Sequence, residues 1–300
     1  MLIATLPSAD KRELVDKIFS HPLVDGARYN VGIRCPYGTK QALGNIKSVA
    51  DKYNKKLWID LKGRQLRIEK WADPTYGDIE LNHEIEVEIP ARIVFRGGHG
   101  TNITHIQSNR IYVNPNPEQA VGAGQAINIL GKGFKIKGDY LTERDREHIR
   151  VAEGLGIHDY MLSFVEWPQD IQDVKALDKD SNLVLKIESL PGLEFVARKY
   201  SDHRDCQLMA ARDDLFINIG ENKFDAIKAL ELILEKDPQA ICASHVFQSL
   251  DSVGYVSMTD ISDMELVRRM GYKNFMFSDE ISHRHFNEAI DAWKYFVKNG

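Results

Sequence analysis

The sequence predicts an α/β protein, a (β/α)8 TIM barrel with a small all-β insertion after its third strand. Short apolar runs of strand length alternate with amphipathic stretches of helix length, which is typical of βαβ units and a parallel sheet. Eight such runs can be found among the 300 residues. Single barrel domains routinely reach about 250 residues, so the length fits one barrel with one insertion.

The eight expected strands follow one another with helices between most of them. The strands are expected at residues 2–6, 29–34, 56–60, 160–164, 183–187, 207–211, 240–244 and 275–278. Helical periodicity is clearest at residues 11–20, 40–53, 142–155, 223–236 and 285–298. Thr142, followed three residues later by Asp145, is a plausible helix start because its hydroxyl can cap the first turn.

One segment interrupts this alternation. From about residue 68 the helical period disappears, and stretches such as IEVEIP at 85–90 alternate apolar and acidic residues as a half-exposed strand does. Turn signals such as DPTYGD and VNPNPE separate these pieces. The predicted organisation is therefore a barrel formed by residues 1–67 and 132–300, with a lid-like β insertion at residues 68–131.

Composition excludes several classes of function. The formal net charge of -5 provides no general attraction to nucleic acid or to an anionic membrane surface. No segment approaches the roughly 18 apolar residues that span a bilayer. The three cysteines are far apart in the sequence, which fits free thiols in a reducing compartment, so we expect a cytoplasmic protein.

Polar residues end seven of the eight expected strands, where the active sites of such barrels lie. They are Arg34, Asp60 with Lys62, Ser163, Lys186 with Glu188, Arg212 with Asp214, Ser244 with His245, and Ser278 with Glu280. A strand period of two puts Lys186 and Glu188 on the same side. Glu188 and Asp214 would suit Mg²⁺ or Mn²⁺, and Lys186 and Arg34 an anionic substrate. Ordinary interior salt bridges are the alternative interpretation.

Several segments in their order resemble the pyruvate kinase family. "YNVGIRCPYGTK" is similar to the strand that ends in the substrate-binding arginine, "IDLKGRQLRI" to the motif before the β lid and "LVLKIESLPGLEFV" to the catalytic Lys-Ile-Glu motif. "QLMAARDDLFINIG" resembles the Ala-Arg-Gly-Asp-Leu-Gly motif, and "ICASHVFQSL" the strand that carries a substrate-binding threonine. The resemblance implies a barrel enzyme that acts on phosphoenolpyruvate, pyruvate or a related oxoacid.

The resemblance also implies roles for individual residues. Lys186 and Arg34 would be catalytic, with Lys186 at the phosphoryl or enolate oxygen and Arg34 on the phosphate. Glu188 and Asp214 would hold the divalent metal. The substrate-binding set would be Arg34, Ser163, Arg212, Asp213 and Ser244, and the candidate contacts to a phosphate or nucleotide are Lys62 and Arg67. ADP or ATP is a second candidate ligand, and a homo-oligomer a candidate assembly.

The sequence departs from the family pattern at several of these positions. The family's monovalent-cation site uses asparagine, serine, aspartate and threonine, and the matching positions here are Pro36, Gly38, Asp60 and Leu61. Dependence on potassium is therefore not expected. The glycine before the metal-binding aspartate is Asp213, the insertion is about half the usual size, and Gln125 stands where a nucleotide-binding lysine is expected.

Three functions fit these observations. The first is metal-dependent phosphoryl transfer with stabilisation of an enolate. The second is a metal-assisted carbon–carbon lyase or aldolase that acts on an oxoacid. The third is a non-catalytic protein that uses the barrel to bind a metabolite or a partner, because a fold does not guarantee its usual chemistry.

Overall fold

The computed structural model describes residues 1–70, 77–95, 99–118, 121–203 and 205–298. The chain divides into two compact units, Met1–Lys62 with Leu141–Gly300, and Gly63–Tyr140. The second unit therefore takes in residues 63–67 and 132–140, which the sequence pattern assigned to the barrel. The reason is strand pairing: Arg67 bridges Ala126, and the strand at Lys135–Ile136 pairs with Ile85–Glu86.

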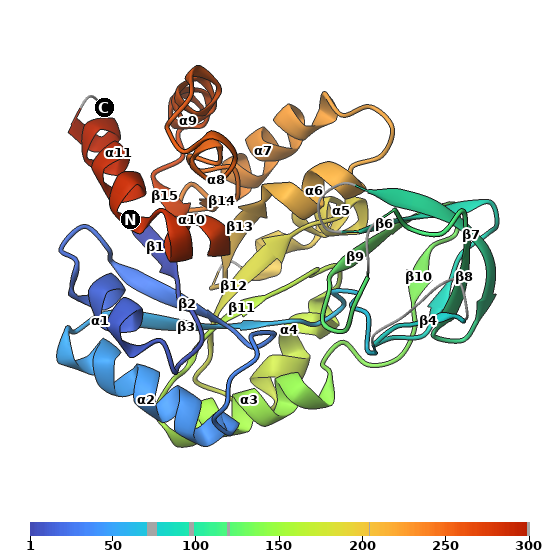
Figure 1. Ribbon diagram of the computed structural model, residues 1–300, viewed down its shortest axis with the longest axis horizontal. Helices are drawn as coiled ribbons and strands as arrows, with labels where there is room; N and C mark the ends of the chain where they lie inside the picture. Colours follow the sequence, from blue (N-terminus) through green and yellow to red (C-terminus); the bar gives the residue numbers. More distant parts are fainter. Residues whose placement is uncertain (71–76, 96–98, 119–120, 204, 299–300) are drawn as a thin grey trace. The chain divides into compact units, whose positions relative to one another are not determined.

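The first unit is a closed barrel of eight parallel strands (Figure 1), in the order β1-β15-β14-β13-β12-β11-β3-β2. This arrangement confirms the predicted fold class. The strands are β1 (Leu2–Thr5), β2 (Gly26–Asn30), β3 (Lys56–Leu61), β11 (Asp159–Leu162), β12 (Asn182–Ile187), β13 (Gln207–Ala211), β14 (Ile241–Ala243) and β15 (Asn274–Met276).

Helices connect the barrel strands and lie outside them (Figure 1). They are α1 (Arg12–Ser20), α2 (Thr39–Lys52), α3 (Glu143–Gly154), α4 (Pro168–Lys175), α5 (Leu190–Arg198), α6 (Arg212–Asn218), α7 (Asp225–Lys236), α8 (Ser249–Val253), α9 (Met258–Met270), α10 (Asp279–Arg284) and α11 (Phe286–Lys298), with a short 3₁₀ turn at Tyr200–His203. Each main helix buries one apolar face, as Ala229, Leu230 and Ile233 of α7 illustrate.

Apolar side chains fill part of the barrel. One buried cluster draws members from seven of the eight strands: Ile3, Trp58, Met161, Val184, Met209, Ile241, Ala243 and Met276. Interior side chains of this size close a barrel rather than leave a pore. The charged side chains that face the barrel axis therefore have to lie beyond this apolar layer, at the ends of the strands.

The predicted second strand was wrong in its position. The sequence placed it at residues 29–34, whereas β2 is Gly26–Asn30, paired with β1 and β3, and the chain turns at Val31. Gly26 suits this place because a Cβ there would lie 2.5 Å from the Trp58 ring. The strand escaped recognition because its middle residue, Arg28, is a charged residue that the fold buries.

Asp145 links the start of α3 to the end of β3. Its carboxylate accepts a hydrogen bond from the backbone N–H of Thr142, and the Thr142 hydroxyl in turn caps the N–H of Asp145, so the predicted capping box is confirmed. The other carboxylate oxygen of Asp145 accepts from the Lys62 N–H at 2.8 Å. This fully buried aspartate thus fixes the chain immediately after Leu61.

The second unit is built from antiparallel strands around its own apolar core. A five-stranded sheet has the order β4-β8-β7-β6-β9, and β10 (Lys135–Ile136) pairs with β5 (Ile85–Glu86). The sheet strands are β4 (Ile79–Glu80), β6 (Ala91–Phe95), β7 (Gly100–Gln107), β8 (Arg110–Asn114) and β9 (Ile127–Leu130). Their buried faces share one cluster that includes Ile93, Ile103 and Ile129.

Neither a membrane-spanning helix nor a disulfide is found among the described residues. None of the helices in the ranges given above is long and apolar enough to cross a membrane. Cys35, Cys206 and Cys242 are free thiols, and burial raises the pKa of Cys206 to about 12 and that of Cys242 to about 11.

Candidate active site

A buried cluster of polar side chains lies at the carboxyl ends of β3, β11 and β12. Its centre is the Lys186 ammonium, whose Nζ lies 3.2 Å from Asp60 Oδ1, 3.2 Å from Glu188 Oε1 and 2.8 Å from Ser163 Oγ. All four side chains are buried. Because buried charges have to be paired, these groups depend on one another. Lys186 and Glu188 lie on the same side of β12, as the alternation along the strand predicted.

Lys186 is held as a cation. Burial works against its charge, but Asp60 and Glu188 outweigh burial and raise the pKa of the ammonium above its ordinary value. The Ser163 hydroxyl donates its hydrogen to the Leu61 carbonyl at 2.8 Å, so towards Lys186 it can only accept. The ammonium is therefore oriented by three acceptors from three different strands or strand ends.

Asp60 joins this lysine to two further cations. Its Oδ2 lies 2.7 Å from Arg28 Nη2 and 3.3 Å from Lys62 Nζ. Burial alone would raise the pKa of Asp60, but Arg28, Lys186 and Lys62 together hold it far below its usual range. Asp60 is consequently a permanent anion that keeps three cations at the barrel mouth.

Arg28 is the residue of this cluster that sequence reasoning missed. Its Nη1 lies 3.1 Å from Asp279 Oδ1 on α10 and 3.2 Å from Thr5 Oγ1 on β1, so it connects three parts of the barrel. Arg34, the arginine proposed from the sequence, lies instead in the loop after β2 and is exposed. A charged residue flanked by alanine and tyrosine in a short run was the signal that could have revealed Arg28.

The position of β2 also changes which residue matches the asparagine of the family's monovalent-cation site. With Arg34 as the arginine that ends the second strand, the asparagine of the family's monovalent-cation site, two residues later, matches Pro36. When Arg28 takes the arginine position, the residue two positions later is Asn30, which is an asparagine and lies in register with Asp60. The match of the asparagine position to Pro36 therefore depends on where the second strand is placed.

Glu188 is a buried carboxyl group beside a second acid. Burial and the nearby charge of Asp214 raise its pKa to about 7, although Lys186 and the N–H of Phe164, at 2.7 Å from Oε2, favour the ionised form. Asp214 lies in the first turn of α6, directly after β13, the neighbour of β12 in the barrel. Two carboxylates from adjacent strands thus repel each other at this end of the barrel.

This pair fits the divalent metal that the sequence predicted. The described residues include no group of three or more His, Cys, Asp or Glu side chains that could form a complete protein cage. Mg²⁺ and Mn²⁺ do not need one, because Mg²⁺ is commonly bound by one or two carboxylates with water and substrate oxygens. Burial is the main cause of the raised pKa of Glu188 and the charge of Asp214 adds to it, and a cation bound between the two carboxylates would favour their ionised forms.

Arg212 organises the neighbouring loop after β14. Its guanidinium binds Asp263 of α9 through two hydrogen bonds of 2.7 and 2.9 Å, and Nε donates to the Ser244 carbonyl at 3.1 Å. Arg212 is buried, and Asp263 raises the pKa of its guanidinium against the effect of burial. The side chain of Arg212 therefore positions the Ser244 loop rather than pointing freely to a substrate.

Asp213 and His245 form a hydrogen-bonded pair beside Asp214. His245 Nε2 lies 2.9 Å from Asp213 Oδ1, and both side chains are about half exposed, at 46% and 56%. Burial of the Asp213 carboxyl works against its ionisation, but hydrogen bonds from His245 and Ser244 lower its pKa below the ordinary value. The sequence predicted a place at the site for each residue separately, and the fold brings the two side chains into contact.

Comparison with known proteins identifies the family. The family model for "Pyruvate kinase, barrel domain" matches residues 92–288, about two thirds of the chain. The chain belongs to the pyruvate kinase family. A pyruvate kinase from Lactobacillus delbrueckii subsp. bulgaricus is 31% identical over 106 residues, which cover 33% of this chain and 17% of that protein.

The family match covers only part of the candidate site. Ser163, Lys186, Glu188, Asp214 and Ser244 lie inside the matched range. Arg28, Asp60 and Lys62 lie outside the match, so the family model does not bear on their place in the site. The chain thus combines a pyruvate kinase barrel with N-terminal strands that complete its charged cluster.

The two proposed phosphate contacts lie in different units of the chain. Lys62 is buried in the barrel against Asp60. Arg67 belongs to the second unit, where its guanidinium donates to the Gln65 side chain at 2.7 and 3.1 Å and to the Gly124 carbonyl. Lys62 therefore joins the charged cluster, and Arg67 is an anchor within its own unit.

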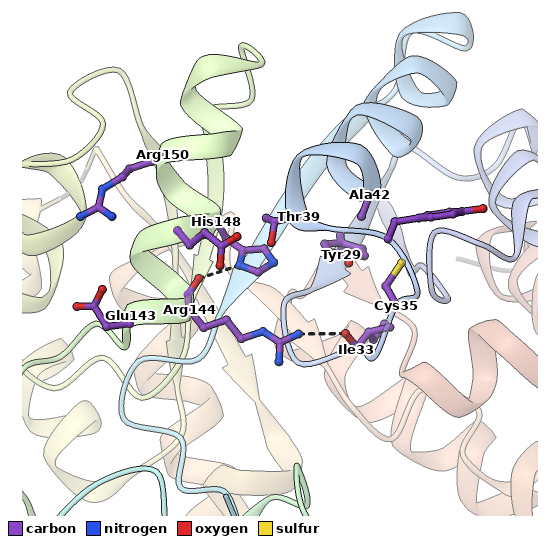
Figure 2. Close-up of a pocket in the computed structure, with 11 residues that line it drawn as sticks. Tyr29, Ile33, Cys35, Thr39, Ala42, Glu143, Arg144, His148 and Arg150 are labelled. Atoms are coloured by element: carbon purple, nitrogen blue, oxygen red, sulfur yellow. Dashed lines mark hydrogen bonds between the residues drawn. The ribbon is translucent and has the colours of Figure 1, made fainter.

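A cavity of about 520 Å³ lies between the start of α2 and α3 (Figure 2). Arg144 spans its mouth by donating to the Ile33 carbonyl at 3.2 Å. His148 donates through Nδ1 to the Arg144 carbonyl, 2.7 Å away, and burial lowers the pKa of its ring. Tyr29 and Cys35 line the same cavity (Figure 2). The cavity lies beside β2, and sequence reasoning did not anticipate it.

A second cavity, of about 830 Å³, contains the arginine that the sequence singled out. Lys11, Arg12, Arg34 and His283 contribute to its lining. It lies along the β1–α1 loop, and His283 is one helical turn after Asp279, the partner of Arg28. Arg34 thus lies in a cavity of mixed charge, because Asp10 and Glu13 line it beside the basic residues.

Proposed function

We propose that this chain is a divalent-metal-dependent enzyme that binds phosphoenolpyruvate, pyruvate or a related oxoacid and stabilises the enolate. The observation that carries the proposal is the Lys186 ammonium, buried and held by Asp60, Glu188 and Ser163. A fixed cation of this kind stabilises negative charge that develops on an oxygen, because no reorganisation is needed during the reaction.

The charge balance of the cluster supports an anionic substrate. Arg28, Lys62 and Lys186 face four carboxylates: Asp60, Glu188, Asp214 and Asp279. A bound Mg²⁺ or Mn²⁺ would neutralise charge on the carboxylate and carbonyl oxygens of the substrate. Glu188 and Asp214 would hold that ion, and the site would then carry an excess of positive charge.

The chain's own residues would divide the remaining tasks. Lys186 would donate a hydrogen bond to the developing enolate or phosphoryl oxygen. Arg28 would face the phosphoryl or carboxylate oxygens, with Asp60 fixing the orientation of both cations. Ser163 would orient the Lys186 ammonium by accepting a hydrogen bond from it. Phosphoryl transfer places just these demands on a protein, namely orientation and charge stabilisation.

A nucleotide as phosphoryl partner is a further part of the proposal. The cavity lined by Lys11, Arg12 and Arg34 offers three cations for phosphate groups, beside the carboxylates of Asp10 and Glu13, and includes His283 of α10. This would give Arg34 a phosphate-binding role at a place apart from the reacting oxygen. The free, buried thiols of Cys206 and Cys242 are in keeping with a reducing compartment such as the cytoplasm.

A metal-assisted lyase or aldolase is the second candidate. It shares the oxoacid, the metal and the enolate, and differs in making or breaking a bond at carbon. The pair of Asp213 and His245 favours it, since a histidine at the site can transfer a proton where phosphoryl transfer alone needs none. A purely binding protein is the third candidate, and it requires neither Lys186 nor Glu188 for a reaction.

Thermal unfolding tests the proposal in stages. The purified protein is heated alone, with Mn²⁺, with Mn²⁺ and oxalate or pyruvate, and finally with ADP added. We expect a rise in the unfolding temperature with Mn²⁺ and a further rise with the oxoacid, because ligands that bind only the folded state stabilise it. A third rise with ADP favours phosphoryl transfer over lyase chemistry.

Two variants make this experiment specific. Glu188→Gln should abolish both rises, whereas Glu194→Gln, an identical change on the exposed face of α5, should leave them intact. If the wild-type protein responds to neither Mn²⁺ nor oxoacid, the enzymatic proposal fails and the search turns to protein partners.

A further inference from the structure

The loop that follows β14 is strained and firmly held. Ser244 and His245 adopt left-handed backbone conformations with φ of 67° and 59°, which residues other than glycine rarely do. Arg212 holds the Ser244 carbonyl and is itself clamped by Asp263. Strain that the surroundings enforce in this way is typical of functional sites. Its consequence here is that the His245 side chain is brought to the Asp213 carboxylate.

The contact with Asp213 determines which nitrogen of His245 is available. An ionised carboxylate can only accept hydrogen bonds, so Nε2, at 2.9 Å from Oδ1, carries the hydrogen. In the neutral ring Nδ1 then has a lone pair. Across the described parts of the chain, no hydrogen bond to this Nδ1 is found. A histidine oriented by a carboxylate and open at its other nitrogen has the arrangement of a general base.

The pair lies next to the proposed enolate site. Asp213 immediately precedes Asp214 in the first turn of α6. Asp214 is in turn close enough to Lys186 and Glu188 to influence both charges. Ser244 and His245 follow β14, the neighbour of β13, at the same end of the barrel. His245 therefore lies at the same end of the barrel as Asp214, on the loop of the neighbouring strand.

We propose that His245, oriented by Asp213, transfers the proton at the carbon next to the substrate's carbonyl group. The inference rests on the proposed function. In the direction of enolate formation, Nδ1 takes the proton from this carbon. The electrons of the C–H bond form the C=C bond, and the carbonyl electron pair moves to the oxygen that Lys186 faces. In the reverse direction the protonated ring returns the proton to carbon, and no oxidant or reductant is needed.

His245 and Asp213 have different parts in this step. His245 is the group that would touch the reacting carbon. Asp213 is a positioning residue that sets the tautomer and stabilises the protonated ring. It also stands where the family motif has glycine, so the pair is a feature of this chain. The substrate class that follows is an oxoacid with at least one hydrogen on the carbon next to the carbonyl, such as pyruvate.

Exchange of the pyruvate methyl hydrogens with deuterium oxide tests this step without any phosphoryl donor. The protein is incubated with Mg²⁺ and pyruvate, the loss of the methyl proton signal is followed by NMR, and the binding of oxalate is measured in parallel. We expect wild-type exchange that requires the metal. His245→Asn should slow it about 100-fold or more while oxalate affinity changes less than twofold.

Matched variants separate the role of Asp213 from a structural effect. Asp213→Asn should slow exchange because the amide can present its N–H to Nε2 and favour the wrong tautomer, and Asp213→Glu should restore part of the rate. His285→Asn is the control, because His285 pairs with Asp251 at 3.8 Å elsewhere in the barrel, and its exchange rate should equal that of wild type. Thermal unfolding verifies that each variant is folded.

The outcomes separate this inference from the function on which it rests. If oxalate binds with the metal but wild type does not exchange pyruvate, or if His245→Asn exchanges at the wild-type rate, His245 is not the proton-transferring group and the proposed function stands. If oxalate does not bind in the presence of metal, the proposed function itself fails, and the role of His245 fails with it.

Discussion

Lys186 and Asp60 form a buried ion pair of 3.2 Å between β12 and β3 at the mouth of the barrel. The pair joins strands that are 126 residues apart in the chain. Because Asp60 also binds Arg28 and Lys62, its one carboxylate compensates three cations. The stability of the barrel and the charge of the candidate site are therefore linked through a single side chain.

Replacing Asp60 should consequently destabilise the protein. Asp60→Asn leaves three buried cations without their shared anion, and removal of one partner from a buried charge pair typically costs about 3 to 5 kcal/mol. Urea unfolding followed by circular dichroism measures the change in free energy. Asp16→Asn, which disturbs an exposed pair with Lys52, should have a much smaller effect, because exposed ion pairs contribute little to stability. Equal effects of the two substitutions would contradict the central place of Asp60.

The two candidate arginines can be distinguished by substrate binding. Arg28→Lys keeps a positive charge near Asp60 but loses the planar group that bonds Asp60, Asp279 and Thr5 together. We expect it to weaken the binding of oxalate in the presence of Mn²⁺ by at least about tenfold, a loss of about 1.4 kcal/mol, as measured by calorimetry. Arg34→Lys should leave oxalate binding unchanged. The opposite ranking would restore Arg34 to the central site.

Glu188 should make the metal-free protein less stable as pH rises. Its pKa is about 7 in the folded state and 4.5 in its ordinary state, so between these values the folded protein binds more protons than the unfolded chain. The free energy of unfolding therefore falls across the window from about 4.5 to about 7 and is constant for this group above it. Urea unfolding at several pH values should show this fall in wild type, and Glu188→Gln should reduce it.

The same carboxyl group should make metal binding depend on pH in the opposite sense. Mn²⁺ has to displace the proton from Glu188, so its affinity should rise with pH up to about 7 and then level off. With this pKa, binding should be about tenfold weaker at pH 6 than at pH 8. Titration followed by the electron paramagnetic resonance of free Mn²⁺ measures the affinity. A flat profile between these two values would mean that Glu188 does not hold the metal.

Much of the fold could be predicted because short sequence patterns identify single helices and strands. The apolar run that became β12 and the capping residue Thr142 each identify their element from neighbouring residues alone. β2 could not be recognised this way, because Arg28 in its middle is compensated by distant partners such as Asp60 on β3, 32 residues away, and Asp279 on α10. Its misplacement carried over to Arg34 and to the potassium argument.

The candidate site divides in the same way. The common face of Lys186 and Glu188 follows from a period of two within one strand, so the sequence could predict it. The contact between Asp213 and His245 depends on the closing of β13 against β14 and on the left-handed backbone at Ser244. Non-local pairing and an unusual φ leave no periodic trace in the sequence, so that contact had to come from the structure.

A crystal structure with Mn²⁺ and oxalate would show directly whether Glu188, Asp214 and Lys186 form one site. We expect an anomalous scattering peak for manganese between the carboxylates of Glu188 and Asp214, with oxalate oxygens on the ion and within hydrogen-bonding distance of the Lys186 ammonium. Manganese bound elsewhere, or oxalate placed away from Lys186 while these two carboxylates remain without a metal, would contradict this expectation.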